Sequence, residues 1–276
     1  MNFDMNTCWS RAVELLQSNF QLLIVIAGMF VLLPTMALYL LVPEFAVIAD
    51  PTTDPSVLED KILEILGPLI AASLVSLVFQ FGGQAAMIAL MSDTRPTVGQ
   101  ALIKGFKTVP SLFAVLLGFS LLFMLLALIV TVPVSLLAGL LGAPGLAALA
   151  VIPMLIAMVW LLARMSLAMP VLVLGGTLNP VTAITQSFRL TKPKQWAIAG
   201  FWTIIFVVIT IASLIFNGVA GVVAAIAGAG TAALAITGLA NGVTGAIGGM
   251  VQCAVAAAMF TQLSGPSTEA IEETFE

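Results

Sequence analysis

Six long apolar stretches alternate with short polar segments along the chain. Crossing about 30 Å of hydrocarbon takes about 20 helical residues, because each residue adds about 1.5 Å to a helix. The stretches meet this length and hold hardly any charge, so they predict an all-α, polytopic integral membrane protein with six transmembrane helices. The predicted spans are residues 20–42, 62–91, 111–141, 146–174, 195–225 and 233–263. Several are near thirty residues long, so we expect tilt, or breaks at Pro133, Pro153 and Pro170.

A short amphipathic stretch precedes each odd-numbered span. Its apolar residues recur at intervals of three, four and seven, which places them on one helical face. We therefore predict interfacial helices that lie in the headgroup layer. The stretches begin near residues 5, 97 and 180, a spacing compatible either with three related units or with linkers that arose without duplication. In the third stretch the apolar face is Val181, Ile184 and Phe188, after Asn179 as cap and Pro180 in the first turn.

We expect one membrane domain over residues 1–276. It comprises an interfacial helix at 1–19, the six-span bundle at 20–263 with linkers at 92–110 and 175–194, and a tail at 264–276. The tail is too short to fold alone, and its carboxylates predict a solvated end. These carboxylates are Glu269, Glu272, Glu273 and Glu276.

Composition excludes a soluble fold. Hydrophobic residues make up 61% of the chain and charged residues 8%, whereas soluble domains average about 25% charged residues. The formal net charge is -4 and the basic residues form no domain-sized face, so nucleic acid is not expected as a partner. The expected surroundings are the lipid bilayer.

The distribution of Lys and Arg predicts the orientation, because positive residues are retained in the cytoplasm. The two linkers are basic and the loop at 43–60 is acidic, so both linkers and both termini are expected on the cytoplasmic side of a bacterial inner membrane. The tryptophans fall toward the same ends of the spans, as an interfacial belt would. The residues concerned are Arg95, Lys104, Lys107, Arg189, Lys192 and Lys194 in the linkers, Glu44, Asp50, Asp54, Glu59 and Asp60 in the loop, and Trp9, Trp160, Trp196 and Trp202.

One region is similar to a known family. Residues 164–174 (RMSLAMPVLVL) and 179–192 (NPVTAITQSFRLTK), followed by an apolar span from Trp196, resemble the bacterial inner-membrane YciC-type proteins. They also resemble the membrane domain attached to some glycerophosphoryl diester phosphodiesterases, and the most specific part is 187–191 (SFRLT). The resemblance implies a six-helix membrane fold without an assigned reaction. The catalytic barrel of the phosphodiesterases has no counterpart in this chain, so their activity is not carried over.

Sequence motifs for catalysis are absent. The chain has no His, which excludes zinc sites of the HExxH kind and histidine proton relays. It also has no GxSxG elbow and no Gly-rich phosphate loop followed by Lys. Cys8 and Cys253 are expected as small packing residues rather than a disulfide. We therefore predict a protein that is not an enzyme and needs no cofactor.

Arg164 is the single charged residue well inside a predicted span, where a central Arg costs about 2.5 kcal/mol or more. No acidic residue lies at its depth, whereas Gln80, Gln84 and Gln252 fall at a similar depth of about 10 to 15 Å. One interpretation is that Arg164 snorkels and that the glutamines join helices. The other is a polar groove at the inner leaflet, where Arg164 meets a lipid phosphate or a partner's carboxylate.

Small residues predict where helices touch. Gly82 and Gly83, beside the two glutamines of the second span, would let another backbone approach. In the last span, glycines recur at steps of four, three and four and so line one face. That face packs either within the chain or in a homodimer. The glycines are Gly238, Gly242, Gly245 and Gly249.

Two classes of function follow. The favoured one is a non-enzymatic accessory or assembly subunit that binds anionic phospholipid and docks an integral membrane partner. The alternative is a small-molecule or lipid transporter that uses the inner-leaflet groove, with an intramembrane enzyme as a third class. The candidate lipid- or partner-binding residues are Arg164, Gln80, Gln84, Gln252, Lys104, Lys107, Arg189, Lys192 and Lys194.

Overall fold

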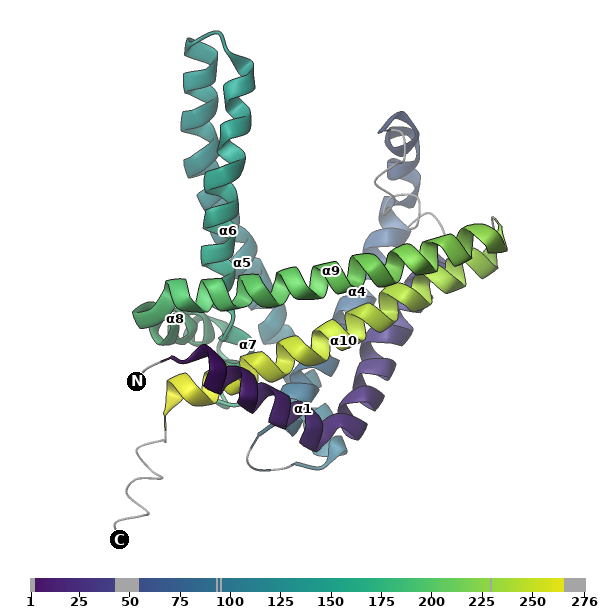
Figure 1. The fold of residues 1–276 in the computed structure, drawn as a ribbon, viewed down its shortest axis with the longest axis vertical. Helices are drawn as coiled ribbons and strands as arrows, with labels where there is room; N and C mark the ends of the chain where they lie inside the picture. Colours follow the sequence, from purple (N-terminus) through teal and green to yellow (C-terminus); the bar gives the residue numbers. More distant parts are fainter. Residues whose placement is uncertain (1–2, 43–54, 93, 95, 229, 266–276) are drawn as a thin grey trace. The chain divides into compact units, whose positions relative to one another are not determined.

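The computed structural model describes residues 3–42, 55–92, 94, 96–228 and 230–265, and every regular element within them is helical (Figure 1). Within these residues, six helices are long and apolar enough to cross a membrane, which confirms the all-α, multi-pass fold. They span Met5–Leu41, Leu66–Leu90, Val98–Leu140, Ala148–Val173, Pro180–Ala227 and Thr231–Ser264.

Long helices alternate with short helical turns along the described chain. They are α1 (Met5–Ala27), the π-helical turn η1 (Gly28–Leu32), α2 (Leu33–Leu41), α4 (Pro55–Leu90), α5 (Val98–Leu140), the 3-10 helix η2 (Pro144–Ala150), α6 (Val151–Met165), α7 (Ala168–Val173), α8 (Pro180–Thr191), the 3-10 turn η3 (Lys192–Lys194), α9 (Gln195–Ala227) and α10 (Thr231–Ser264). Glu44, Asp50, Asp54, Arg95 and the four tail carboxylates lie outside the described residues.

The three amphipathic stretches are helical, but they join their spans in different ways. α1 begins at Met5 and α5 at Val98, and each continues without a break into the apolar span. α8 is a separate helix, because Pro193 lies in the 3-10 turn that leads into α9. α5 passes through both Pro110 and Pro133. The break in the fourth span falls between α6 and α7, just before Pro170.

Large apolar side chains cover the outside of the spanning helices. Between residues 113 and 137 of α5 no side chain is buried, and Leu121 is 62% exposed. α9 presents Val208, Ile211 and Leu214 in the same way. A soluble protein rarely exposes a continuous apolar surface of this kind, whereas hydrocarbon solvates it. The exposed surface therefore agrees with a membrane environment.

The chain forms two compact units. Unit 1 comprises Met1–Ser10, Pro110–Ile205 and Ala258–Glu276, and unit 2 comprises Arg11–Val109 and Phe206–Ala257. The unit boundaries pass through α1, α5, α9 and α10, so these helices contribute residues to both units.

Unit 2 is built on close contacts between η1, α4 and the start of α5. Phe30 lies 5.4 Å from Phe106 and 6.3 Å from Phe79, measured between ring centroids. Gly83 makes room for Phe30, because a Cβ at Gly83 would overlap the Cβ of Phe30. A Cβ at Gly105 of α5 would lie only 2.5 Å from the carbonyl oxygen of Gly82. The glycines of α4 thus admit another backbone, as expected from the sequence.

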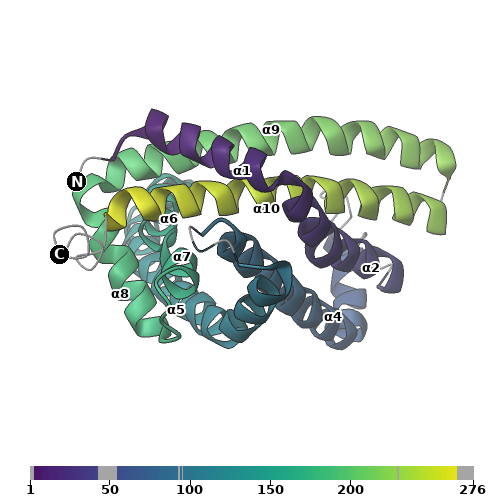
Figure 2. The same cartoon turned by 90° about the horizontal axis from the view of Figure 1, so that it is seen from below.

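The remaining core of unit 2 lies along α10. Residues 206–227 of α9 and 231–257 of α10 run side by side in opposite directions (Figures 1 and 2), and Asn217 donates a hydrogen bond of 3.3 Å to Thr244 Oγ1 between them. The turn η1 packs on another face of α10. In η1 the amide of Leu33 donates to the carbonyl of Gly28, five residues earlier. This bond accommodates one more residue per turn than an α-helix has.

Candidate functional site around Arg164

The break between α6 and α7 in unit 1 is closed by a side chain of α8. Ser187 Oγ donates a hydrogen bond of 2.6 Å to the carbonyl oxygen of Arg164 and accepts one of 3.2 Å from the amide of Leu167. Both groups lie at a helix end, where backbone partners are missing. Ser187 is fully buried and therefore replaces water at this break.

α8 contacts α6 and α7 through a stripe of small residues. Ala183, Ser187 and Thr191 are four residues apart and fully buried, so they share the docked face. Asn179 caps the helix by accepting from the amide of Val181 at 2.9 Å. Val181, in contrast, is exposed, which fits the predicted membrane-facing side of this amphipathic helix.

The guanidinium of Arg164 lies inside this junction, with only 7% of the residue exposed. Its Nη1 donates a hydrogen bond of 3.2 Å to Thr191 Oγ1, and Thr191 Oγ1 in turn donates to the carbonyl of Ser187 at 2.8 Å. Nε is buried and has no hydrogen-bond partner among the described atoms. No described carboxylate forms an ion pair with Arg164 either, so its charge is not neutralised by an acid of the described chain.

Two aromatic rings surround the same guanidinium. Its central carbon lies 4.6 Å from the ring centroid of Phe188 and 5.9 Å from that of Trp160. The two rings are nearly perpendicular, at 84° and 6.2 Å between centroids. Trp160 Nε1 donates to Gln195 Oε1 at 3.2 Å and so links α6 to the start of α9. Cation–π contacts with two rings stabilise a buried cation that has no anionic partner among the residues the structure describes.

The sequence pattern missed most of this cluster. The apolar periodicity placed Phe188 on a membrane-facing side, whereas its ring contacts Arg164. Ser187 and Thr191 gave no periodicity signal because they are polar. Their spacing of four, next to Ala183, is the feature that marks the docked face. The residues of α8 that contact Arg164 are Ser187, Phe188 and Thr191, and all of them fall within the SFRLT motif at 187–191.

The predicted glutamines belong to unit 2, whereas Arg164 belongs to unit 1. The three glutamines, Gln80, Gln84 and Gln252, are partly buried. Gln80 Nε2 donates a hydrogen bond of 2.9 Å to Ser76 Oγ on its own helix. The backbone carbonyl of Gln84 accepts from Cys253 Sγ at 3.6 Å, which joins α4 to α10. A common groove of Gln80, Gln84 and Gln252 with Arg164 stays a prediction.

The basic linker residues are exposed. Lys104 and Lys107 lie on the first turns of α5, in unit 2. Arg189, Lys192 and Lys194 lie at the end of α8 and in η3, in unit 1, where they form a cationic segment. Trp196 lies in the first turn of α9, two residues after Lys194, and is 62% exposed. The cationic segment (residues 189–194) is therefore continuous with an exposed aromatic residue and an apolar helix.

The glycines of α10 differ in what they contact. A Cβ at Gly242 would lie 3.0 Å from the carbonyl oxygen of Leu32, and one at Gly238 would lie 3.0 Å from Tyr39 Cβ. Gly245 has only the Val31 side chain nearby, at 3.6 Å, and Gly249 has nothing within 4 Å. The closest approach to η1 and α2 therefore involves the first two glycines.

Comparison with known proteins adds no identity to this geometry: no protein-family model, curated protein or solved structure matches the chain. Within the described residues, no group of His, Cys, Asp and Glu side chains is arranged to hold a metal ion. The arrangement around Arg164 can hold a helix against a broken span and can offer a positive charge to an anion.

Proposed function

We propose that this chain is a non-enzymatic protein of the bacterial inner membrane, an accessory or assembly subunit that binds anionic phospholipid and docks a membrane partner. The observation that carries the proposal is the exposure of all three side chains of the cationic segment, Arg189, Lys192 and Lys194, at the start of an apolar helix. The resemblance to YciC-type proteins belongs to the same proposal, because it covers this segment.

The chemistry of the cationic segment suits an anionic membrane surface. A Lys or Arg near such a surface contributes about 1 kcal/mol, and tryptophans favour the headgroup level. Trp196 is exposed two residues after Lys194. The orientation with both termini in the cytoplasm brings the segment to the inner leaflet.

The Arg164 cluster supports this function in two ways. It fixes α8 on α6, which keeps the cationic segment at a defined position relative to the broken span. Its guanidinium also keeps a donor without a partner in the described chain. A lipid phosphate or the carboxylate of a partner subunit would neutralise this charge.

Native mass spectrometry of protein purified in mild detergent tests lipid binding. Neutralising all three cations in Arg189→Gln/Lys192→Gln/Lys194→Gln removes about 3 kcal/mol of attraction, which corresponds to roughly 100-fold weaker binding of anionic lipid. The double variant Lys104→Gln/Lys107→Gln measures how much the linker at 92–110 contributes to the binding of anionic lipid. Lys61→Gln, directly after the acidic loop at 43–60 that is predicted on the opposite side, is the control. Equal retention of phosphatidylglycerol by the triple variant and by this control would contradict the proposal.

Cysteine labelling in intact spheroplasts tests the orientation. In a background with Cys8→Ala and Cys253→Ala, Asp54→Cys should react with an impermeant maleimide and Gln186→Cys should not. Both native cysteines are buried, so Ala is a conservative replacement. The reverse labelling pattern would place the termini outside and contradict the proposed location of the cationic segment. Co-purification from detergent extracts then asks whether a second membrane protein accompanies the chain.

A further inference from the structure

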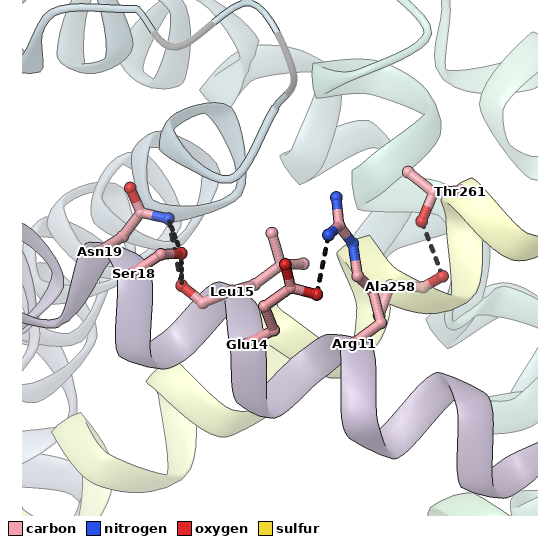
Figure 3. A network of polar contacts seen from close by, with 7 residues as sticks. All are labelled: Arg11, Glu14, Leu15, Ser18, Asn19, Ala258 and Thr261. Atoms are coloured by element: carbon pink, nitrogen blue, oxygen red, sulfur yellow. Dashed lines mark hydrogen bonds and ion pairs between the residues drawn. The ribbon is translucent and has the colours of Figure 1, made fainter.

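A cavity of about 520 Å³ opens in unit 2 between α1 and the end of α4. Its polar side is formed by Arg11, Glu14, Ser18 and Asn19, on successive turns of α1 (Figure 3). Its apolar side includes Leu15 and Met91, both buried. The cavity therefore combines a polar wall with an apolar one.

The position of the cavity in the two helices suits the surface of a bilayer. α1 becomes continuously apolar from residue 22 onward, and the apolar run of α4 ends at residues 90–91. The lining residues of α1 lie before its apolar run and at the start of that run, and the other lining residues lie at the end of α4 or just after it. A site at the end of two spans meets the headgroups of one leaflet, with the acyl region beneath it.

Opposite charges stand side by side on the polar wall. Arg11 Nη1 lies 2.9 Å from Glu14 Oε2, and the two side chains remain 42% and 66% exposed (Figure 3). Ion pairs between such exposed side chains are weak, so both groups can exchange partners with a ligand. Ser18 and Asn19 both bond to the carbonyl of Leu15, which holds these polar groups one turn below the ion pair.

We propose that this cavity binds the headgroup of a zwitterionic phospholipid with a primary ammonium, phosphatidylethanolamine. The phosphate would contact Arg11 and the ammonium would contact Glu14, so each member of the weak pair gains a charge-assisted partner in the ligand. An anionic headgroup would gain Arg11 but would face the carboxylate of Glu14. A lone cation would gain the carboxylate of Glu14 but would face the guanidinium of Arg11.

The lining also discriminates between ammonium groups. A quaternary ammonium has no N–H to donate to Glu14 and is bound best by aromatic cages. The described lining of the cavity contains no aromatic side chain. Phosphatidylcholine should therefore bind less tightly than phosphatidylethanolamine, by about tenfold for one lost charge-assisted hydrogen bond.

The experiment measures lipid occupancy of the full chain by native mass spectrometry after delipidation. Phosphatidylethanolamine, phosphatidylcholine and phosphatidylglycerol with identical acyl chains are added in turn. The wild type should prefer phosphatidylethanolamine over phosphatidylcholine about tenfold. Glu14→Gln should bring the two lipids to equal occupancy, and Arg11→Gln should lower the occupancy of both. Equal occupancy by ethanolamine and choline lipids in the wild type would overturn the proposal, and this comparison needs no variant to fold.

Matched variants separate the cavity from general surface charge. Gln17 is exposed on α1 and does not line the cavity. Gln17→Lys makes the same charge change as Glu14→Gln, and Gln17→Glu the same change as Arg11→Gln, and both should keep the wild-type preference. Loss of the preference in the Gln17 variants would also overturn the proposal. Soluble glycerophosphoethanolamine should not compete, because it lacks acyl chains for the apolar wall, and efficient competition would assign the cavity to a soluble ligand instead.

This site is independent of the anionic-lipid function. The triple variant of the cationic segment should keep the preference for phosphatidylethanolamine, and Glu14→Gln should keep the binding of phosphatidylglycerol to that segment. The two proposals can therefore fail separately.

Discussion

The two units hold their helices together by different means. In unit 2, glycines bring η1, α4 and α5 so close that Gly105 faces the backbone of Gly82. In unit 1, the polar side chains of Ser187 and Thr191 fix α8 on the broken span and surround the backbone and guanidinium of Arg164. The first contact depends on the absence of side-chain volume, and the second on the presence of hydrogen-bonding groups.

This difference has a consequence for stability in a membrane. Lipid is as apolar as the helix surfaces, so burial of apolar area does little to join helices there. Close packing and hydrogen bonds must supply the association. The contacts of η1, α4 and α5 in unit 2 depend mainly on the first contribution, and the contact of α8 with the broken span in unit 1 depends on the second. Substitutions that add volume should therefore act on the η1–α4–α5 contact of unit 2, and substitutions that remove polar atoms should act on the α8 contact of unit 1.

The largest effect is expected at Gly105. A Cβ there would lie 2.5 Å from the Gly82 carbonyl oxygen and 2.8 Å from the Ala86 amide nitrogen, and backbone atoms cannot move aside. Gly105→Ala should lower the free energy of unfolding by about 3 kcal/mol, measured by thermal unfolding in detergent. Gly99→Ala on the same helix has open space and should be neutral or slightly stabilising. Equal stability of the two variants would show that α4 and α5 do not pack closely.

The next effect is expected at Arg164. Arg164→Ala removes a hydrogen bond from a charged donor and two cation–π contacts, which together correspond to about 2 to 3 kcal/mol. Arg164→Lys should restore only part of the stability, because Lys lacks the planar guanidinium. Arg164→Ala should also carry less anionic lipid in native mass spectrometry. Unchanged stability together with unchanged lipid occupancy would mean that Arg164 only snorkels.

The smallest effect separates the glycines of α10. Gly242→Ala should cost about 1 kcal/mol, because its Cβ would press on the Leu32 backbone, whereas Gly249→Ala should not be destabilising. Gly245 tolerates Ala but not Leu, since Val31 lies 3.6 Å from the added Cβ. Thermal unfolding and size-exclusion chromatography report stability and oligomeric state. A stable but dissociated Gly249→Leu variant would instead place a homodimer contact on that open position.

The sequence was sufficient for the six spans, because the length of an apolar run is itself the physical requirement for crossing a bilayer. It also indicated Gly82 and Gly83 as a close backbone contact. The break between α6 and α7 could not be placed, because Pro170 marks only its neighbourhood. What holds the break is a hydrogen bond from Ser187 to a carbonyl 23 residues earlier, and periodicity carries no information about such a pair.

The cluster around Arg164 was foreseen only in part. The depth of Arg164 in an apolar run indicated that it needs partners. Aromatic and hydroxyl partners from the following amphipathic helix could not be predicted, because depth within a span identifies only polar side chains of other spans at the same level. Phe188 and Thr191 are found only when α8 is docked.

The turn η1 makes the number of residues in the first span as important as their identity. Its extra residue rotates everything that follows by about 100° relative to a regular α-helix. With this offset, Phe30 fits against Gly83 while the Leu32 backbone lies against Gly242. Deleting the exposed Met29 from this turn would let a regular α-helix continue with α2 in the same orientation, because the turn holds one extra residue. The first span can therefore lose a codon within η1, whereas a codon gained or lost elsewhere in α1 or α2 would rotate the residues beyond it away from their partners.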